Sequence, residues 1–149
     1  MNKILFVCHG NICRSTMAEF VLKDMVNKMG LSDKFMIESA GTSCEESGSD
    51  IHYGTKKKLT EMKIPFESRK ARRVNVDDYH KFDWLICMDD NNVKNLKSII
   101  GNDTDNKIKL LLSYAQRQES IKDPWYTNDF DATYIDVVDG CHGIIKTMK

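Results

Sequence analysis

The feature that most constrains the fold is a short apolar run that leads at once into a tight loop and an amphipathic helix. Residues 3–7 have the length and composition of a buried strand. The helix is predicted over residues 15–29, with Ser15 as its N-cap and Gly30 as its C-terminal stop. Between them lies the sequence CHGNICRS, residues 8–15. This order of strand, loop and helix is typical of α/β folds.

The same alternation continues along the chain. Further strands are predicted over residues 34–39, 83–88 and 107–111, and further helices over residues 54–63, 89–100 and 129–148. The pattern predicts one domain over residues 1–149, a three-layer, doubly wound α/β fold with a four-stranded parallel sheet and helices on both faces. Ligands of such folds bind outside the carboxyl ends of the strands, so we expect a site in the loop that begins at Cys8.

Composition excludes several classes of function. Lysine plus arginine and aspartate plus glutamate each number 22, which argues against a nucleic-acid binder with a broad basic surface. The first apolar run is too short for a secretory signal and no stretch is long enough to cross a bilayer, so we expect a cytoplasmic protein. The cysteines are odd in number, irregularly spaced and not clustered with histidines, which predicts neither a disulfide framework nor a metal site. They are Cys8, Cys13, Cys44, Cys87 and Cys141.

The loop after the first strand has the composition of an anion-binding loop. Successive backbone N–H groups in such a loop can face inward, and the N-terminus of the following helix adds its positive dipole end. Gly10 and Asn11 tolerate the left-handed backbone that a tight loop needs. The residues expected to surround a bound phosphate are His9, Gly10, Asn11, Ile12, Cys13 and Ser15.

Two side chains turn this loop into a candidate catalytic site. The planar guanidinium of Arg14 can bind two phosphate oxygens at once. Cys8 lies in the same positive field, which stabilises the thiolate, the nucleophilic form of cysteine. Ser15 can donate a hydrogen bond to that thiolate. The segment therefore predicts a thiolate that faces a phosphorus atom.

Cleavage of a phosphate ester also needs a proton donor for the leaving oxygen. The best candidate is Asp123, because Pro124 stiffens the backbone after it and two aromatic residues, Trp125 and Tyr126, follow. His9 is next to Cys8, but neighbouring side chains in a curled loop usually point apart.

These segments resemble the low-molecular-weight protein tyrosine phosphatase family. The shared segments are FVCHGNICRS near the N-terminus, ESAGT at residues 38–42, LICMD at 85–89 and DPWYTND at 123–129. The resemblance spans nearly the whole chain. It implies an enzyme without metal or cofactor that hydrolyses phosphotyrosine in proteins in two steps, through a cysteinyl-phosphate.

The resemblance also implies roles for single residues. Cys8 would attack the phosphorus, Arg14 and the loop amides would hold the phosphoryl group, and Asp123 would protonate the leaving oxygen and then activate water. Asn11 would support the loop through contacts with Ser15 and Ser39.

Other implied roles concern the pocket and its redox chemistry. Trp125 would form a wall that stacks on the substrate ring, with Ile12 and Tyr126 beside it. Cys13 would pair reversibly with Cys8 and shelter the nucleophile from over-oxidation. One departure is Glu45, which stands where family members often have an aromatic residue. We expect an acidic lip there and lower activity on acidic than on basic phosphopeptides.

Three alternatives remain open. An arsenate reductase of the same fold would need a closely spaced relay cysteine after the third strand, where only Cys87 occurs. A protein-arginine phosphatase tends to have threonine in place of Ile12, and an apolar side chain suits a flat aryl ring better than a guanidinium. A non-catalytic phosphate-binding module would lack the nucleophile or the acid. A rim formed by Trp125 and Tyr126 leaves both a monomer and weak self-association open.

Overall fold

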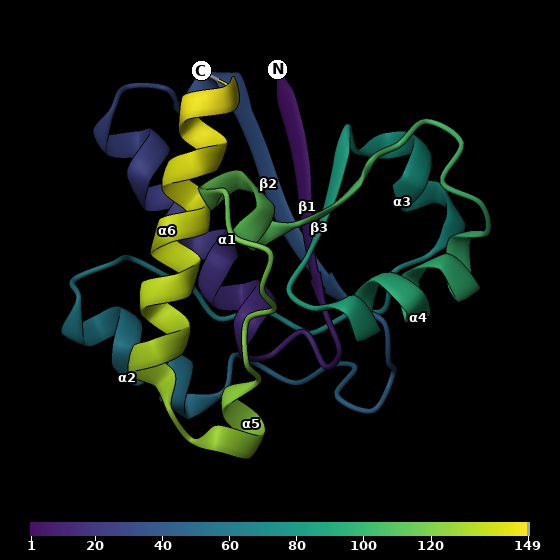
Figure 1. Cartoon of the computed structure of the whole chain (residues 1–149). Helices are drawn as coiled ribbons and strands as arrows, with labels where there is room; N and C mark the ends of the chain where they lie inside the picture. Colours follow the sequence, from purple (N-terminus) through teal and green to yellow (C-terminus); the bar gives the residue numbers. More distant parts are fainter. Residues whose placement is uncertain (149) are drawn as a thin grey trace.

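A four-stranded parallel sheet forms the centre of the structure (Figure 1). The computed structural model describes residues 1–148. The strands are β1 (Asn2–Cys8), β2 (Phe35–Gly41), β3 (Trp84–Cys87) and β4 (Ile108–Leu110). Their order in the sheet is β2-β1-β3-β4, and each neighbouring pair is parallel. The predicted four-stranded parallel sheet is therefore confirmed.

Helices cover both faces of this sheet, as predicted. One side carries α1 (Arg14–Lys28), α2 (Tyr53–Glu61) and α6 (Phe130–Met148), and the other carries α3 (Val76–Lys81) and α4 (Asp90–Ile100). Two short 3₁₀ turns, η1 (Ser32–Lys34) and η2 (Leu111–Ala115), precede β2 and follow β4. The single-turn helix α5 (Pro124–Thr127) lies beyond the carboxyl ends of the strands, beside the loop that follows β1, and both termini lie at the opposite end of the sheet (Figure 1).

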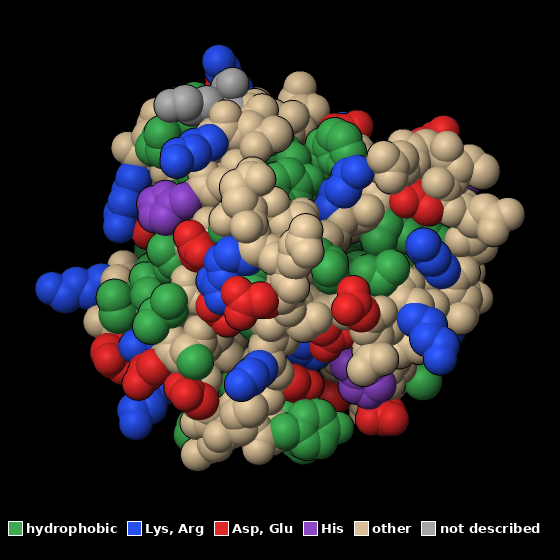
Figure 2. All heavy atoms as spheres, viewed as in Figure 1, with side chains coloured by type: hydrophobic (Ala, Val, Ile, Leu, Met, Phe, Trp, Pro, Cys, Tyr) green, Lys and Arg blue, Asp and Glu red, His purple; other side chains and the backbone are tan. Residues whose placement is uncertain are grey.

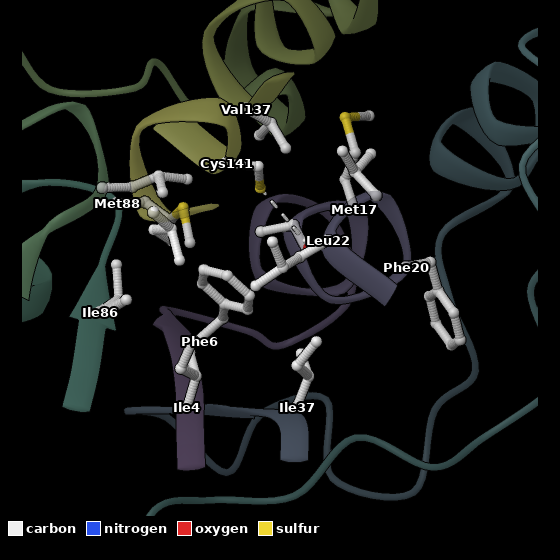
Figure 3. Packing of buried hydrophobic residues seen from close by; sticks show 14 of the residues in the cluster. Ile4, Phe6, Met17, Phe20, Leu22, Ile37, Ile86, Met88, Val137 and Cys141 are labelled. Atoms are coloured by element: carbon white, nitrogen blue, oxygen red, sulfur yellow. Dashed lines mark hydrogen bonds between the residues drawn. The ribbon is translucent and has the colours of Figure 1, made fainter. Parts of the chain in front are cut away.

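The central strand β1 contributes side chains to two hydrophobic cores. Ile4 and Phe6 pack beneath α1 and α6, as Figure 3 shows, while Leu5 and Val7 belong to the core under α3 and α4. Successive side chains of a strand point to opposite faces, so a strand covered on both sides must be apolar at every position. This explains why residues 4–7 form a continuous apolar run.

The order of the strands places the site. The chain leaves β1 for β2 on one side and later returns to β3 on the other, so β1 and β3 border the point where the winding direction changes. Val7 pairs in register with Cys87, which brings the ends of β1 and β3 together. The residues that follow these two strands therefore meet at one edge of the sheet.

The start of α1 differs from the prediction. The helix begins at Arg14, its N-cap residue is Cys13, and no side chain caps it. The prediction that Ser15 is the N-cap is wrong, because the Ser15 hydroxyl lies inside the first turn and bonds to Cys8 and Asn11 instead. The first-turn N–H groups thus keep no side-chain partner and can serve a bound anion.

Other boundaries differ by a few residues, and one helix was missed. Gly30 has φ 70 and ends α1 as predicted. Helix α2 starts one residue earlier than expected, with His52 as its N-cap, and ends two residues earlier, at Glu61. Helix α3 was not predicted, although Asn75 and Asp78 form a capping box that marks its start.

The closing helix α6 packs on η2 through two glycines. A Cβ at Gly140 would lie 2.5 Å from Cγ of Leu111, and one at Gly143 would lie 2.0 Å from the carbonyl oxygen of Tyr114. Both distances are shorter than any van der Waals contact, so the helix approaches η2 this closely only because these residues lack side chains. Within residues 1–148 no helix is both long and apolar enough to cross a membrane.

We predict that Gly143→Ala lowers the free energy of unfolding by about 3 kcal/mol, despite the better helix propensity of alanine, because the added methyl overpacks against backbone. Urea denaturation followed by circular dichroism measures the change. Ile135→Ala, on the exposed side of the same helix, is the control and should change stability by less than about 0.5 kcal/mol. A Gly143→Ala variant as stable as wild type contradicts the prediction.

Candidate active site

The loop between β1 and α1 curls around the end of the strand at Asn11. Asn11 has φ 59, in the left-handed region that asparagine tolerates better than most residues. Gly10 does not have a positive φ, so only Asn11 of the two uses this conformational freedom. A Cβ at Gly10 would also meet only ordinary contacts, the nearest being Cγ of Glu46 at 3.6 Å.

Gly41 at the end of β2 allows this loop to lie against the sheet. A Cβ at Gly41 would lie 2.7 Å from the carbonyl oxygen of His9 and 3.2 Å from Cβ of Asn11. Beyond it, the N–H of Thr42 donates to the carbonyl of Cys8 at 2.9 Å and that of Ser43 to His9 at 3.0 Å. The glycine is therefore required by the close approach of two backbones.

The side chain of Asn11 holds the loop from behind. Its Nδ2 donates to Oγ of Ser15 at 2.9 Å and to Oγ of Ser39 at 3.0 Å, and its Oδ1 accepts from the backbone N–H of Arg72 at 3.2 Å. The Ser39 hydroxyl in turn donates to Glu19. Asn11 is buried, and these bonds satisfy both of its donor hydrogens and its acceptor. The predicted support residues Ser15 and Ser39 thus lie together with Asn11.

The same network orients Ser15 toward Cys8. Sγ of Cys8 lies 3.0 Å from Oγ of Ser15 and donates to it in the thiol form. Because the Ser15 oxygen already accepts a hydrogen from Asn11, its own hydrogen is free to point at Cys8 when the sulfur is a thiolate. The position suits stabilisation of a thiolate.

A second arginine supports the outer side of the loop. Nη2 of Arg69 donates to the carbonyl oxygen of Asn11, and Nη1 donates to the carbonyl of Ser49 at 3.4 Å. Burial lowers the pKa of Arg69, while the negative charges of Glu19 and Cys8 act against this. Arginine nevertheless stays protonated in proteins, so this guanidinium adds a positive charge behind the loop that begins at Cys8.

Arg14 reaches across the end of the sheet from the first turn of α1. Its Nη1 donates to Oδ2 of Asp89 at 2.6 Å and to the carbonyl of Ile121 at 2.9 Å, and its Nη2 lies 3.4 Å from Oδ2 of Asp123. Burial would lower the pKa of Arg14, but Cys8 and the two carboxylates outweigh it, so the pKa is raised. The guanidinium is a permanent positive charge in a fixed plane.

Asp89 fixes that plane because it is itself held by a helix. It is the N-cap of α4, where its Oδ1 accepts from the N–H of Asn92 at 2.7 Å, while its Oδ2 binds Arg14. Asp89 lies two residues after the end of β3, at the edge of the sheet where β1 ends at Cys8. It was not predicted as a site residue.

Asp123 occupies the N-cap of α5. Its Oδ1 accepts from the N–H of Trp125 at 3.0 Å, which leaves Oδ2 directed toward Arg14. Pro124 takes the first helical position, where its missing N–H costs no hydrogen bond. The Asp-Pro pair therefore places one carboxylate oxygen over the loop.

One cavity of about 110 Å³ joins the predicted nucleophile, arginine and acid. Of the other predicted residues, Asn11, Ser15 and Ser39 do not line the cavity, and their side chains are hydrogen-bonded to one another. Glu46 belongs to the lining but was not predicted. The lining residues are Cys8, His9, Gly10, Ile12, Cys13, Arg14, Glu45, Glu46, Asp123, Trp125 and Tyr126. A larger groove of about 480 Å³ lies between α1, β2 and residues 65–67, and its lining contains no cysteine or histidine.

The rim of this cavity has both acidic and aromatic side chains. Nε2 of His9 lies 3.6 Å from Oε2 of Glu45, and both side chains are largely exposed. Trp125 and Tyr126 are 57% and 83% exposed, so neither ring is packed into the core. The rim therefore offers surfaces for a ligand to cover.

The second cysteine of the loop differs chemically from Cys8. Burial, followed by the negative charges of Cys8 and Asp123, raises the pKa of Cys13 to about 12. Cys13 is therefore a thiol at neutral pH, although it lines the same cavity. Burial also raises the pKa of Cys87 and Cys141, which lie in the two hydrophobic cores. Over residues 1–148, no three histidine, cysteine or acidic side chains are grouped as metal ligands would be.

A cysteine at the end of the first strand, in a loop that leads into a helix N-terminus, is an arrangement suited to a thiolate beside a bound anion. A family model described as low molecular weight phosphotyrosine protein phosphatase matches residues 3–149. The chain belongs to this family.

Individual relatives match this chain in sequence and in structure over nearly their full lengths. SP-PTP, the low molecular weight protein tyrosine phosphatase from Streptococcus pyogenes, is 43% identical, and its crystal structure superposes with a TM-score of 0.90, covering 100% of this chain and 94% of that one. Low molecular weight protein-tyrosine-phosphatase YfkJ from Bacillus subtilis is 36% identical over 100% of this chain and 97% of its own, and its structure gives a TM-score of 0.94. DARP, a drosophila arginine phosphatase, is 30% identical with a TM-score of 0.89, over 100% of this chain and 98% of that one.

The residues that sequence reasoning missed differ in the signal they carry. Asp89 follows a predicted strand, so the rule that strand ends share one edge could have found it. Gly41 also ends a strand, where a glycine marks a close backbone approach. Arg69 carries no such signal, because it lies in an irregular segment whose position depends on tertiary structure.

We predict that Arg69→Met weakens anion binding in the loop about tenfold, because a charged hydrogen bond to the Asn11 carbonyl is lost. The measurement is the concentration of inorganic phosphate that protects Cys8 from alkylation by iodoacetate. Arg69→Lys should lose less, and Lys70→Met, at the exposed neighbouring position, should behave as wild type. Equal protection of wild type and Arg69→Met would show that Arg69 has no such role.

Proposed function

We propose that residues 1–149 form one metal-independent phosphatase domain that hydrolyses phosphotyrosine in proteins through a cysteinyl-phosphate. The observation that carries this proposal is that Cys8, Arg14 and Asp123 line one small cavity. Family membership supports the same activity. The cytoplasm is the expected compartment, since all five cysteines are unpaired and a nucleophilic thiol needs a reducing environment.

In the first step, the Cys8 thiolate attacks the phosphorus and forms the S–P bond. The P–O bond to the leaving group breaks, and its electron pair stays on the leaving oxygen, which takes a proton from the Asp123 carboxyl group. The loop N–H groups and Arg14 hold the three remaining oxygens as charge spreads over them. For this, Nη2 of Arg14 exchanges its long contact with Asp123 for a phosphate oxygen, while Asp89 and the Ile121 carbonyl keep Nη1 in place.

In the second step, the Asp123 carboxylate takes a proton from water. The water oxygen attacks the phosphorus, the S–P bond breaks, and its electron pair returns to Cys8 as a thiolate. The Ser15 hydroxyl, 3.0 Å from Sγ, donates to the departing thiolate and so stabilises it. Inorganic phosphate leaves, and Asp123 is again protonated for the next cycle.

The pocket walls favour an aryl phosphate. Ile12 and Trp125 provide apolar surface on the lining, and a phosphotyrosine ring can stack on the indole. The substrate that we propose is a phosphorylated tyrosine in a protein segment. The chain acts as a monomer or with weak self-association. Acidic and basic side chains are mixed over the face shown in Figure 2, without a patch of one sign.

Phosphoarginine is the second candidate substrate. DARP, named as an arginine phosphatase, is 30% identical to this chain, and Glu45 and Glu46 on the rim could bind a guanidinium. Ile12 argues against it, because an apolar side chain offers a polar group no hydrogen bond. Arsenate reduction has less support, since Cys87 and Cys141 are fully buried and cannot relay a disulfide to the surface.

We predict that Cys8→Ser abolishes hydrolysis of p-nitrophenyl phosphate without added metal, because serine supplies no thiolate. Asp123→Ala should lower kcat about 10²- to 10³-fold for phenyl phosphate, whose leaving group needs a proton, and less for p-nitrophenyl phosphate. Steady-state kinetics measure both. Cys44→Ser and Asp33→Ala, outside the cavity, serve as controls.

Two outcomes would overturn the proposal. Turnover retained in Cys8→Ser would exclude the cysteinyl-phosphate. Hydrolysis of phosphoarginine at the rate of phosphotyrosine would overturn the choice of substrate.

We predict that the acidic rim reduces kcat/KM for phosphotyrosine peptides with acidic flanks about two- to fivefold relative to peptides with basic flanks, a modest effect because Glu45 is exposed. Glu45→Trp should remove this difference and lower KM by adding a second aromatic wall, and added salt should weaken it in wild type. Glu67→Gln, in the lining of the other groove and not of this cavity, should leave the preference unchanged. An undiminished preference in Glu45→Trp would exclude Glu45 as its source.

A further inference from the structure

Little in its own helix fixes the orientation of the Trp125 indole. It belongs to α5, a helix of one turn, and is 57% exposed. Its backbone N–H is fixed by Asp123, but this bond does not set the direction of the ring. Within residues 1–148, one aromatic ring contacts the indole, the imidazole of His52, with ring centroids 5.7 Å apart and planes at 76°. An edge-to-face contact of this kind defines the orientation of both rings.

His52 is in turn fixed to the phosphate-binding loop and to α2. Its backbone N–H donates to the carbonyl oxygen of Ile12 at 2.9 Å, next to the centre of the loop. Its Nδ1 accepts from the N–H of Gly54 at 3.0 Å and so caps α2. An acceptor Nδ1 means that the proton of the neutral ring is on Nε2. The imidazole cannot turn without losing this cap.

Phe130 holds the same ring from α6. The Phe130 and His52 rings stack with centroids 5.4 Å apart at 20°. Phe130 also packs against the small buried cluster formed by the loop residues Ile12 and Cys13 together with Ala71. A Cβ at Gly54 would lie 2.4 Å from the Phe130 ring, so glycine at the start of α2 is what admits it. His52 is thus held between α2, α6 and the loop, whereas Trp125 is held by His52.

We propose that His52 is a positioning residue, which holds the Trp125 indole at the pocket wall and so couples the phosphate-binding loop to recognition of the aryl group. The proposal rests on the proposed function, in which Trp125 stacks on the substrate ring. His52 itself is not among the residues that line the cavity. It therefore acts on KM for aryl substrates through Trp125, and leaves phosphate binding and the chemical steps unchanged.

Two substitutions separate the two roles of the imidazole. His52→Asn keeps a side-chain acceptor that is well suited to an N-cap but removes the ring. His52→Phe keeps a ring of similar size but removes the acceptor. We expect that the imidazole ring of His52, and not its capping acceptor, sets the orientation of the Trp125 indole.

The first measurement is the fluorescence of Trp125 itself. The chain has two tryptophans, so a Trp84→Phe background leaves Trp125 as the single reporter. In His52→Asn the emission should shift to the red and acrylamide quenching should increase, because the indole is freer and more exposed. His52→Phe should keep the wild-type emission but melt at a lower temperature. Tyr53→Ala, which removes an exposed ring that stacks on His52, is the matched control. It should keep both the wild-type emission and the wild-type melting temperature.

The second measurement is a split between KM and kcat. His52→Asn should raise KM for p-nitrophenyl phosphate about three- to tenfold, the range of one aromatic contact. The inhibition constant of inorganic phosphate and kcat should stay within about twofold, since neither depends on the indole. In a Trp125→Ala background the same substitution should leave KM unchanged, because the coupled ring is already gone.

The outcomes decide the proposal and the proposed function separately. Wild-type emission in His52→Asn overturns the positioning role, and so does a KM increase that persists in Trp125→Ala. Altered emission with unchanged KM overturns the coupling to aryl recognition. If wild type hydrolyses no aryl phosphate, the proposed function fails, while the emission still decides whether His52 holds Trp125. Should His52→Asn not fold, His52→Asp provides the same cap without a ring.

Discussion

The left-handed turn at Asn11 is the constraint on which the rest of the site depends. A residue at φ 59 needs compensation, and here the side chain supplies it by bonding to α1 through Ser15, to β2 through Ser39 and to residue 72. The turn brings the loop N–H groups and the start of α1 to the same point as the end of β1. These attachments therefore hold the loop that begins at Cys8 against β2 and α1.

Arg14 adds charge to this arrangement under a different constraint. A buried guanidinium is costly unless it is paired, and Asp89, Asp123 and the Ile121 carbonyl pair it. The contacts are unequal, at 2.6 Å to Asp89 and 3.4 Å to Asp123. The short one belongs to a carboxylate that also caps α4, so it fixes the guanidinium plane, while the long one can be exchanged for a substrate oxygen. One residue thus has both a permanent and a replaceable partner.

The parts that could be predicted from the sequence are those set by local pattern. The apolar run of residues 4–7 is continuous because β1 is buried on both faces. The alternation of strands with helices along the chain predicted the parallel sheet. The grouping of Cys8, Arg14 and Asp123 was predicted partly from strand-end geometry and partly from family resemblance. Ser15 was wrongly predicted as the N-cap because serine is a favoured N-cap residue. Nothing in the local sequence indicates that Asn11 donates a hydrogen bond to its hydroxyl. Arg69 depends on where an irregular segment lies, which only the tertiary structure determines.

The floor of the pocket, formed by the loop that begins at Cys8, and its wall, formed by Trp125, differ in how they are attached to the fold. The floor is tied to β1, β2 and α1 by buried hydrogen bonds, so the atoms that perform the chemistry are preorganised. The proposed wall is carried by α5, a single turn whose Trp125 and Tyr126 are exposed. Such a turn cannot orient an indole by itself. A second element must therefore connect floor and wall, and His52 is bonded to the first through Ile12 and in contact with the second through Trp125.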